Sequence, residues 1–158
     1  MKHQWQTTLI NAIQDPMELL QHLNISQHFE KLDPDVLQAF HCRVPEPFLH
    51  RIEKNNPHDP LLRQVLPIND ELDIVPGYST DPLQEHHHQP TQGLLHKYHG
   101  RVLLTLTGAC AINCRYCFRR HFPYQEHTFN QTRWNAIVNH LKADDNIHEV
   151  ILSGGDPL

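Results

Sequence analysis

The stretch "RVLLTLT", residues 101–107, sets the fold class that the sequence predicts. It is rich in leucine and β-branched residues and lies between Gly100 and Gly108, which is typical of a short strand buried on both faces. Further along, "FNQTRWNAIVNHLKA" (129–143) has a helical period, and "HEVILSGG" (148–155) has the composition of a second buried strand. Strand, helix and strand in this order predict a βαβ unit with parallel strands, and therefore an α/β fold.

Two unusual loops follow the predicted strands. "GACAINCRYC" (108–117) comes directly after the first strand, and "GGDPL" (154–158) ends the second. The carboxyl ends of parallel strands meet at one edge of the sheet, where folds of this class place their functional loops. We therefore expect the functional site at this edge.

Upstream of the strands, the chain reads as short helices separated by prolines. "DPMELLQHLN" (15–24) and "DPDVLQAFHCRV" (33–44) each begin with Asp-Pro, which is a common helix start, and continue with apolar residues at helical spacing. The sequence predicts a helical region over 1–66, an extended connecting segment over 67–94, and the start of an α/β domain over 95–158.

Composition limits the class of protein. The chain has 158 residues, with 13 Lys and Arg against 18 Asp and Glu, so the formal net charge is −5 and no helix gathers basic residues. Non-specific nucleic-acid binding is not expected. No apolar run approaches the roughly 20 residues that span a bilayer, and the N-terminus lacks a signal-peptide pattern. We expect a cytoplasmic protein with no membrane segment, and we interpret "EHHHQP" (85–90) as a solvated loop.

Three of the four cysteines, Cys110, Cys114 and Cys117, lie in one loop, which is more typical of a metal site than of a disulfide framework. Thiolates suit zinc, copper(I) and iron–sulfur clusters. A structural zinc site needs a fourth protein ligand, which His121 could supply. A cubane cluster on three cysteines instead leaves one iron open. Cys42, on a predicted helix, is expected to be a small buried hydrophobe.

The loop "CAINCRYC" (110–117) resembles the CxxxCxxC loop of the radical SAM superfamily, including the aromatic residue Tyr116 before the last cysteine. The resemblance implies a [4Fe–4S] cluster on the three cysteines, with S-adenosylmethionine on the open iron, cleaved to methionine and a 5′-deoxyadenosyl radical. It also implies that Tyr116, Gly154, Gly155 and Asp156 contact S-adenosylmethionine. Glycines allow a close backbone approach, and Asp156 can accept a hydrogen bond from an ammonium group.

A narrower resemblance covers nearly the whole chain. The segments at 94–124, "LLHKYHGRVLLTLTGACAINCRYCFRRHFPY", and at 150–158, "VILSGGDPL", are similar to the lysine 2,3-aminomutase family, and the N-terminal segment at 43–67 resembles its elongation factor P branch. The family resemblance implies conversion of L-α-lysine to β-lysine by migration of the amino group from C2 to C3. It further implies pyridoxal 5′-phosphate as a cofactor, a reductant such as flavodoxin or ferredoxin, and a possible homo-oligomer.

Family positions give further expected roles to basic residues. Arg119 matches the arginine that pairs with the lysine carboxylate, for which a guanidinium fork is well suited. Lys97 and Arg101 fall where the family places contacts to pyridoxal phosphate. Neither Lys97 nor Lys142 matches the family's Schiff-base lysine, so that residue is not expected in this chain.

The length of the chain raises a last expectation. A complete β/α barrel takes about 250 residues. This sequence contains only the first two predicted strands of such a barrel. We therefore expect the N-terminal portion of a partial, TIM-like radical SAM barrel enzyme, inactive on its own. A zinc-binding Cys3His interaction module and a non-catalytic remnant are the alternative interpretations.

Overall fold

The structure of the chain is a computed structural model that describes residues 3–29, 31–39, 41–117, 120–121 and 130–156. Contacts group the chain into two compact units. The helical unit comprises residues 1–77 and 111–120, and the sheet unit comprises residues 78–110 and 121–158. The three-part division at residues 66 and 94 stays a prediction.

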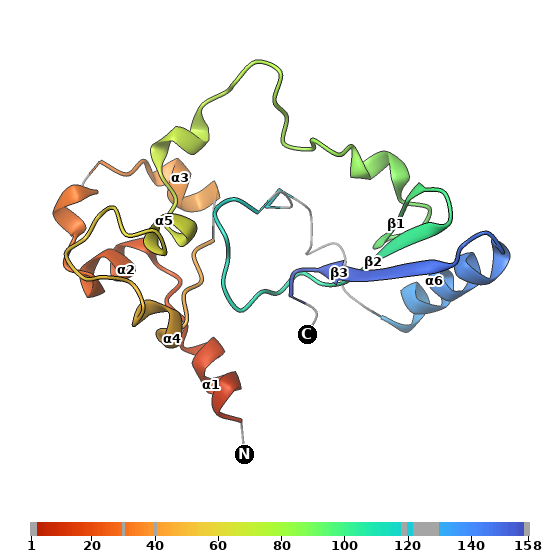
Figure 1. The fold of residues 1–158 in the computed structure, drawn as a ribbon, viewed down its shortest axis with the longest axis horizontal. Coiled ribbons are helices and arrows are strands. Elements are labelled where there is room, and N and C mark those ends of the chain that lie inside the picture. Colours follow the sequence, from red (N-terminus) through yellow and green to blue (C-terminus); the bar gives the residue numbers. More distant parts are fainter. Residues whose placement is uncertain (1–2, 30, 40, 118–119, 122–129, 157–158) are drawn as a thin grey trace. The chain divides into compact units, whose positions relative to one another are not determined.

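Short helices make up the first part of the helical unit (Figure 1). Their bounds are α1 Gln4–Ile10, α2 Pro16–His22, η1 Ser26–His28, α3 Pro34–Ala39, α4 Glu46–Leu49, α5 Leu62–Val65 and η2 Asn69–Leu72. The predicted Asp-Pro starts are confirmed, because the carboxylates of Asp15 and Asp33 accept hydrogen bonds of 2.9 Å from the backbone N–H of Met17 and Asp35.

The helical unit has a hydrophobic core of its own. Its buried members are Ile13, Leu19, Leu20, Leu23, Ile25, Cys42, Val44, Ile52, Leu62, Val65 and Leu66. Ile112, from the segment that carries Cys114 and Cys117, packs against this core. The helices thereby provide an apolar support for part of the predicted metal-binding loop.

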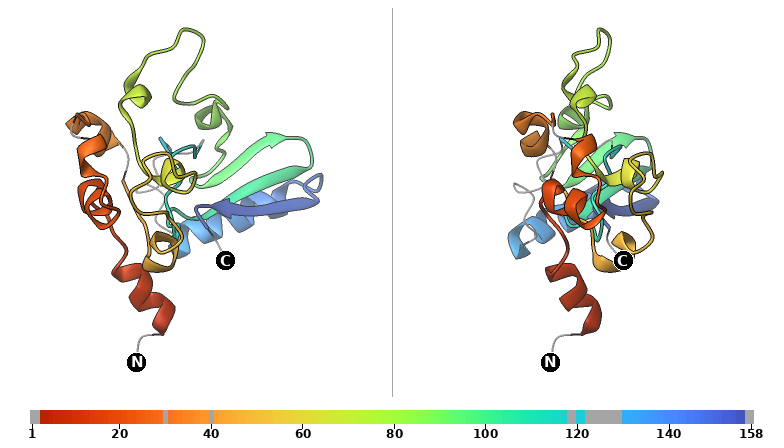
Figure 2. Two further views of the ribbon diagram at one scale, coloured as in Figure 1. Left: turned by 60° about the vertical axis from the view of Figure 1, so that its left-hand side comes forward. Right: turned by 90° about the vertical axis from the view of Figure 1, so that its left-hand side faces the viewer.

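The sheet unit contains the predicted βαβ arrangement. Its strands are β1 Leu94–Tyr98, β2 Arg101–Thr107 and β3 Glu149–Gly154, in the order β1-β2-β3, and its helices are η3 Glu85–His88 and α6 Gln131–Ala143. β2 and β3 are parallel and α6 connects them, as predicted, so the α/β class is confirmed. α6 packs along one face of the sheet, where Ile137 meets Leu94, Val102 and Leu104 (Figures 1 and 2).

Strand β1 was not predicted. It pairs with β2 in antiparallel register, and the turn between them contains Gly100 at a φ of +76°, a backbone conformation that favours glycine. Residue 94, which the sequence analysis assigned to the end of an extended segment, is therefore the first residue of this hairpin.

Three predictions of burial were wrong. In β2 only Val102, Leu104 and Thr105 are buried, and the other residues of the strand are half-buried or exposed, so the strand is only partly covered. β3 is an edge strand, and its Leu152 is 58% exposed. The helical period of 129–143 predicts an apolar face that contains Trp134 and Ile137; Ile137 is buried, but Trp134 is exposed and Arg133 is buried.

Arg133 is buried because its guanidinium has backbone partners. Its Nε donates to the carbonyl of Gln92 and its Nη2 to the carbonyl of Thr105, each at 2.8 Å. The guanidinium passes against Gly93, where any side chain would collide with it. Arg133 thus joins α6 to the hairpin through hydrogen bonds to two backbone carbonyls.

Helices of the described chain are all too short or too polar to cross a lipid bilayer.

Candidate functional site

The cysteine segment, defined here as residues 111–120, is hydrogen-bonded to the helical unit. The side-chain amide of Asn113 donates to the carbonyl of His41 at 2.7 Å. The backbone N–H of Arg115 donates to the carbonyl of Gln64, also at 2.7 Å. These bonds join the segment to two separate stretches of the N-terminal region, so its path is set by helices that precede it in the chain.

Cys114 and Cys117 share one turn of this segment. The backbone N–H of Cys117 donates to the carbonyl of Cys114 at 3.1 Å, and both residues are half-buried. Cys110 is half-buried too, but it is the last residue of its stretch in the sheet unit. In the part of the chain that the structure describes, no three potential metal-ligating side chains already converge on one point.

The donor set nevertheless fits an iron–sulfur cluster by its chemistry. All four cysteines lie among the described residues, and none of them forms a disulfide. Burial and the nearby Asp15 raise the pKa of the Cys42 thiol from 9.0 to about 12, which disfavours the thiolate that a metal needs. Three half-buried thiols in one loop therefore stand apart from a fourth that belongs to the core, as expected for Cys42.

The glycine motif lies against the residues that lead into Cys110. The backbone N–H of Gly155 donates to the carbonyl of Thr107 at 2.7 Å, and that of Asp156 donates to the carbonyl of Ala109 at 2.9 Å. A Cβ atom at position 155 would collide with the backbone of Ala109. The sheet unit thus brings Asp156 beside the backbone that precedes the first cysteine, and glycine is the residue that permits this approach.

Three other residues predicted for the site, Tyr116, Lys97 and Arg101, are exposed. Tyr116 is 70% exposed. Lys97 donates from Nζ to the carbonyl of Leu83 at 2.7 Å, and Arg101 forms an exposed ion pair with Glu149, with 3.0 Å between Nε and Oε2.

Two further residues complete the predicted set. His121, the proposed fourth zinc ligand, is exposed and belongs to the sheet unit. The predicted substrate residue, Arg119, lies outside the described residues.

One residue of the site region was missed by the sequence analysis. Glu71, on η2, forms an ion pair with Arg115, with 2.5 Å between Oε1 and Nε, and a second one with Arg120 through Oε2. No local motif marks Glu71, because it lies in the stretch interpreted as an extended connection. In the sequence, the only signal for a carboxylate partner is the group of arginines close to the cysteines, namely Arg115, Arg119 and Arg120.

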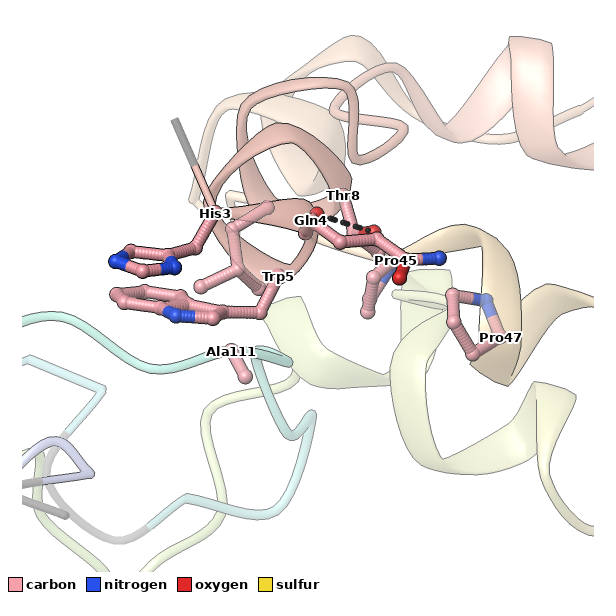
Figure 3. A pocket seen from close by; sticks show the side chains of 8 residues that line it. His3, Gln4, Trp5, Thr8, Pro45, Pro47 and Ala111 are labelled. Atoms are coloured by element: carbon pink, nitrogen blue, oxygen red, sulfur yellow. Dashed lines mark hydrogen bonds between the residues drawn. The ribbon is translucent and has the colours of Figure 1, made fainter. Parts of the chain in front are cut away.

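A shallow apolar groove lies along α1 of the helical unit (Figure 3). Trp5 forms one wall, Pro45 and Pro47 form the other, and Ala111 of the cysteine segment lies at its edge. The side chain of Thr8 is bonded to the Gln4 carbonyl rather than directed to a ligand. His3 also lines the groove, and its ring lies against that of Trp5, so the groove offers mainly apolar contact together with one imidazole.

Comparison with known proteins gives the family. A family model described as a 4Fe-4S single cluster domain matches residues 99–158. Proteins named L-lysine 2,3-aminomutase from Escherichia coli, Haemophilus influenzae and Acetoanaerobium sticklandii are 51%, 46% and 32% identical to the chain over 98–99% of its length. The matches cover 46%, 46% and 37% of those proteins, so the chain spans about half the length of the first two. The chain therefore belongs to the lysine 2,3-aminomutase family.

Proposed function

We propose that the protein to which this chain belongs is a radical SAM aminomutase that converts L-α-lysine to β-lysine by moving the amino group from C2 to C3. The observation that carries this proposal is the 51% identity, over 99% of the chain, to the Escherichia coli L-lysine 2,3-aminomutase. The spacing of Cys110, Cys114 and Cys117 supports it, because three thiolates leave one iron of a cubane without a protein ligand.

In this proposal the three cysteine thiolates hold a [4Fe–4S] cluster. When bound, the cluster supplies the electron that cleaves S-adenosylmethionine. Gly154 and Gly155 keep side chains away from the cofactor, and Asp156 accepts a hydrogen bond from its ammonium group. Tyr116, which is exposed, supplies a ring beside the cofactor.

In this proposal, basic residues bind the phosphate of pyridoxal 5′-phosphate and the carboxylate of the substrate lysine. Lys97 and Arg101 bind the phosphate of pyridoxal 5′-phosphate, and their present partners, a backbone carbonyl and an exposed carboxylate, are exchanged at little cost. Arg119 binds the lysine carboxylate through both arms of its guanidinium. The lysine that binds pyridoxal phosphate covalently belongs to another part of the protein.

The same proposal covers the setting of the enzyme. The mixed sheet is the start of a partial β/α barrel, and the exposed edge of β3 receives its next strand. The protein works in the cytoplasm as a homo-oligomer, with flavodoxin or ferredoxin as reductant, and its β-lysine serves the modification of elongation factor P.

Reconstitution of the full-length protein with iron and sulfide under anaerobic conditions tests the proposal. We expect a brown protein whose electron paramagnetic resonance signal changes with S-adenosylmethionine and which forms β-lysine from L-α-lysine. Serine at position 110, 114 or 117 should abolish iron binding, whereas Cys42→Ala, the matched control in the core, should retain it. A colourless protein with one zinc per chain, lost in His121→Ala, would instead establish the zinc module, and retention of neither metal would establish the remnant.

A further inference from the structure

A single carboxylate of the helical unit binds two arginines of the cysteine segment. Arg115 donates from Nε to Oε1 of Glu71 at 2.5 Å, and Arg120 donates from Nη1 to Oε2 of the same residue. The Glu71 side chain is only 12% exposed, and those of Arg115 and Arg120 are 25% and 17% exposed. Charge pairs that are this far withdrawn from water are weakly screened and directional.

One of the two arginines lies within the turn that carries Cys114 and Cys117, and the other follows this turn. Arg115 directly follows Cys114, and its backbone N–H is bonded to the helical unit. Arg120 donates its backbone N–H to the carbonyl of Cys117 at 3.1 Å, and its Nη1 lies 3.3 Å from the carbonyl of Arg115. The start and the end of the turn are therefore both joined to Glu71.

Glu71 itself is held in place by its own helix. Its Oε1 also accepts a hydrogen bond of 3.2 Å from the backbone N–H of Ile68, at the start of η2. η2 is connected to the rest of the unit through Asn69, whose side chain bonds the backbone of Lys31 and Asp33. The carboxylate is thus a fixed point rather than a mobile surface charge.

We propose that Glu71 is a positioning residue for the iron–sulfur cluster: through Arg115 and Arg120 it holds the turn of Cys114 and Cys117 in one conformation. The inference rests on the proposed function, because it assumes that these thiolates bind the cluster. Groups that orient metal ligands without touching the metal affect affinity by about 10- to 100-fold when they are removed. Glu71 also places one negative charge beside two positive ones, so its loss changes the electrostatic field at the cluster.

The decisive variant is Glu71→Gln in the full-length protein. The Gln Oε1 can still accept the hydrogen bond from Ile68, so η2 keeps its cap, but the charge that binds Arg115 and Arg120 is lost. Asp70→Asn is the matched control, because Asp70 lies on the same short helix and its side chain is exposed. Both variants remove one carboxylate, and only one of them affects the arginines.

We expect Glu71→Gln to release iron to a chelator about 10- to 100-fold faster than wild type. We also expect it to raise the midpoint potential of the cluster and to broaden its electron paramagnetic resonance signal. Asp70→Asn should match wild type in all three measurements. The melting temperature of each apoprotein is measured as well, and iron release is compared at a temperature at which both variants are folded, which separates positioning from folding.

A second variant guards against a folding defect. Arg115→Gln combined with Arg120→Gln leaves Glu71 and η2 intact and should show the same faster iron release, and adding Glu71→Gln to it should have no further effect. If wild type assembles the cluster and Glu71→Gln behaves as Asp70→Asn does, or if the effects of the three substitutions simply add, this inference is overturned alone. Failure of wild type to assemble any cluster overturns the proposed function instead.

Discussion

The cysteine segment and the glycine motif are held in opposite ways. The described residues of the cysteine segment are held in the helical unit chiefly by side chains, above all by Glu71 with its two arginines and by Asn113, besides the backbone bond of Arg115 to Gln64. Residues 154–156 are fixed within the sheet unit by backbone hydrogen bonds to Thr107 and Ala109. The first arrangement depends on charge and the second on the absence of a side chain, so the two respond to different substitutions.

The largest effect should come from Arg133, the buried arginine that joins α6 to the hairpin in the sheet unit. Arg133→Met keeps the apolar stem but leaves the carbonyls of Gln92 and Thr105 without these donors, at a cost of about 1–3 kcal/mol for each. Urea unfolding of the apoprotein measures this loss. Lys142→Met, an exposed site on the same helix, is the control and should change the free energy of unfolding by less than about 0.5 kcal/mol. Equal stability of both variants would show that backbone pairing alone holds this unit.

A second prediction separates Cys42 from the cysteine segment. Because its pKa is raised from 9.0 to about 12, the buried thiol stabilises the fold fully below pH 9, and this contribution is lost as the pH rises through 12. The loss should amount to about 1.4 kcal/mol for each pH unit above 9. The difference in free energy of unfolding between wild type and Cys42→Ala, measured from pH 8 to pH 11, isolates this contribution. A difference that does not depend on pH would contradict the burial of the thiol.

Gly155→Ala tests the glycine motif by adding a single methyl group. The new Cβ would meet the backbone of Ala109, which cannot rotate away, so we expect a loss of about 1–3 kcal/mol in the free energy of unfolding. S-adenosylmethionine affinity should fall as well. Gly77→Ala is the comparison, because its Cβ meets open space and only its φ of +88° opposes the change. Unchanged stability of Gly155→Ala would mean that the motif is not held by close backbone approach.

The smallest effect should come from the exposed ion pair of the sheet unit. Glu149→Gln removes the partner of Arg101 where both side chains are about half exposed, so the expected cost is about 0.2–1 kcal/mol. Thermal unfolding at low and at high salt should show this difference shrinking as salt rises. A loss as large as that of Arg133→Met would remove the distinction between buried and exposed charge on which the comparison depends.

Local patterns predicted much of this arrangement. The apolar run of β2 and the capped helix starts at Asp15 and Asp33 were recognisable because strand composition and capping act over a few residues. The cysteine spacing likewise lies within eight residues of sequence. Such features carry their physical cause within the segment itself.

Features that depend on distant partners were missed. Glu71 and Arg115 are 44 residues apart, and nothing near Glu71 distinguishes it from the other acidic residues. The burial of Arg133 was not predicted, because a charged residue is buried only where polar partners are available, here the carbonyls of Gln92 and Thr105. β1 was missed because its short apolar pair follows a stretch rich in proline and glycine.

The return of the chain to the helical unit has a consequence for biosynthesis. The carbonyl of His41 can accept its hydrogen bond from the side chain of Asn113 only after the ribosome has added 72 more residues. Until the ribosome has released the cysteine segment, the N-terminal helices lack Ile112 against their core, and Glu71 lacks both arginines. Cys114 and Cys117 therefore join the helical unit only after its N-terminal helices have been synthesised, and in the proposed function the cluster would form after that unit has folded.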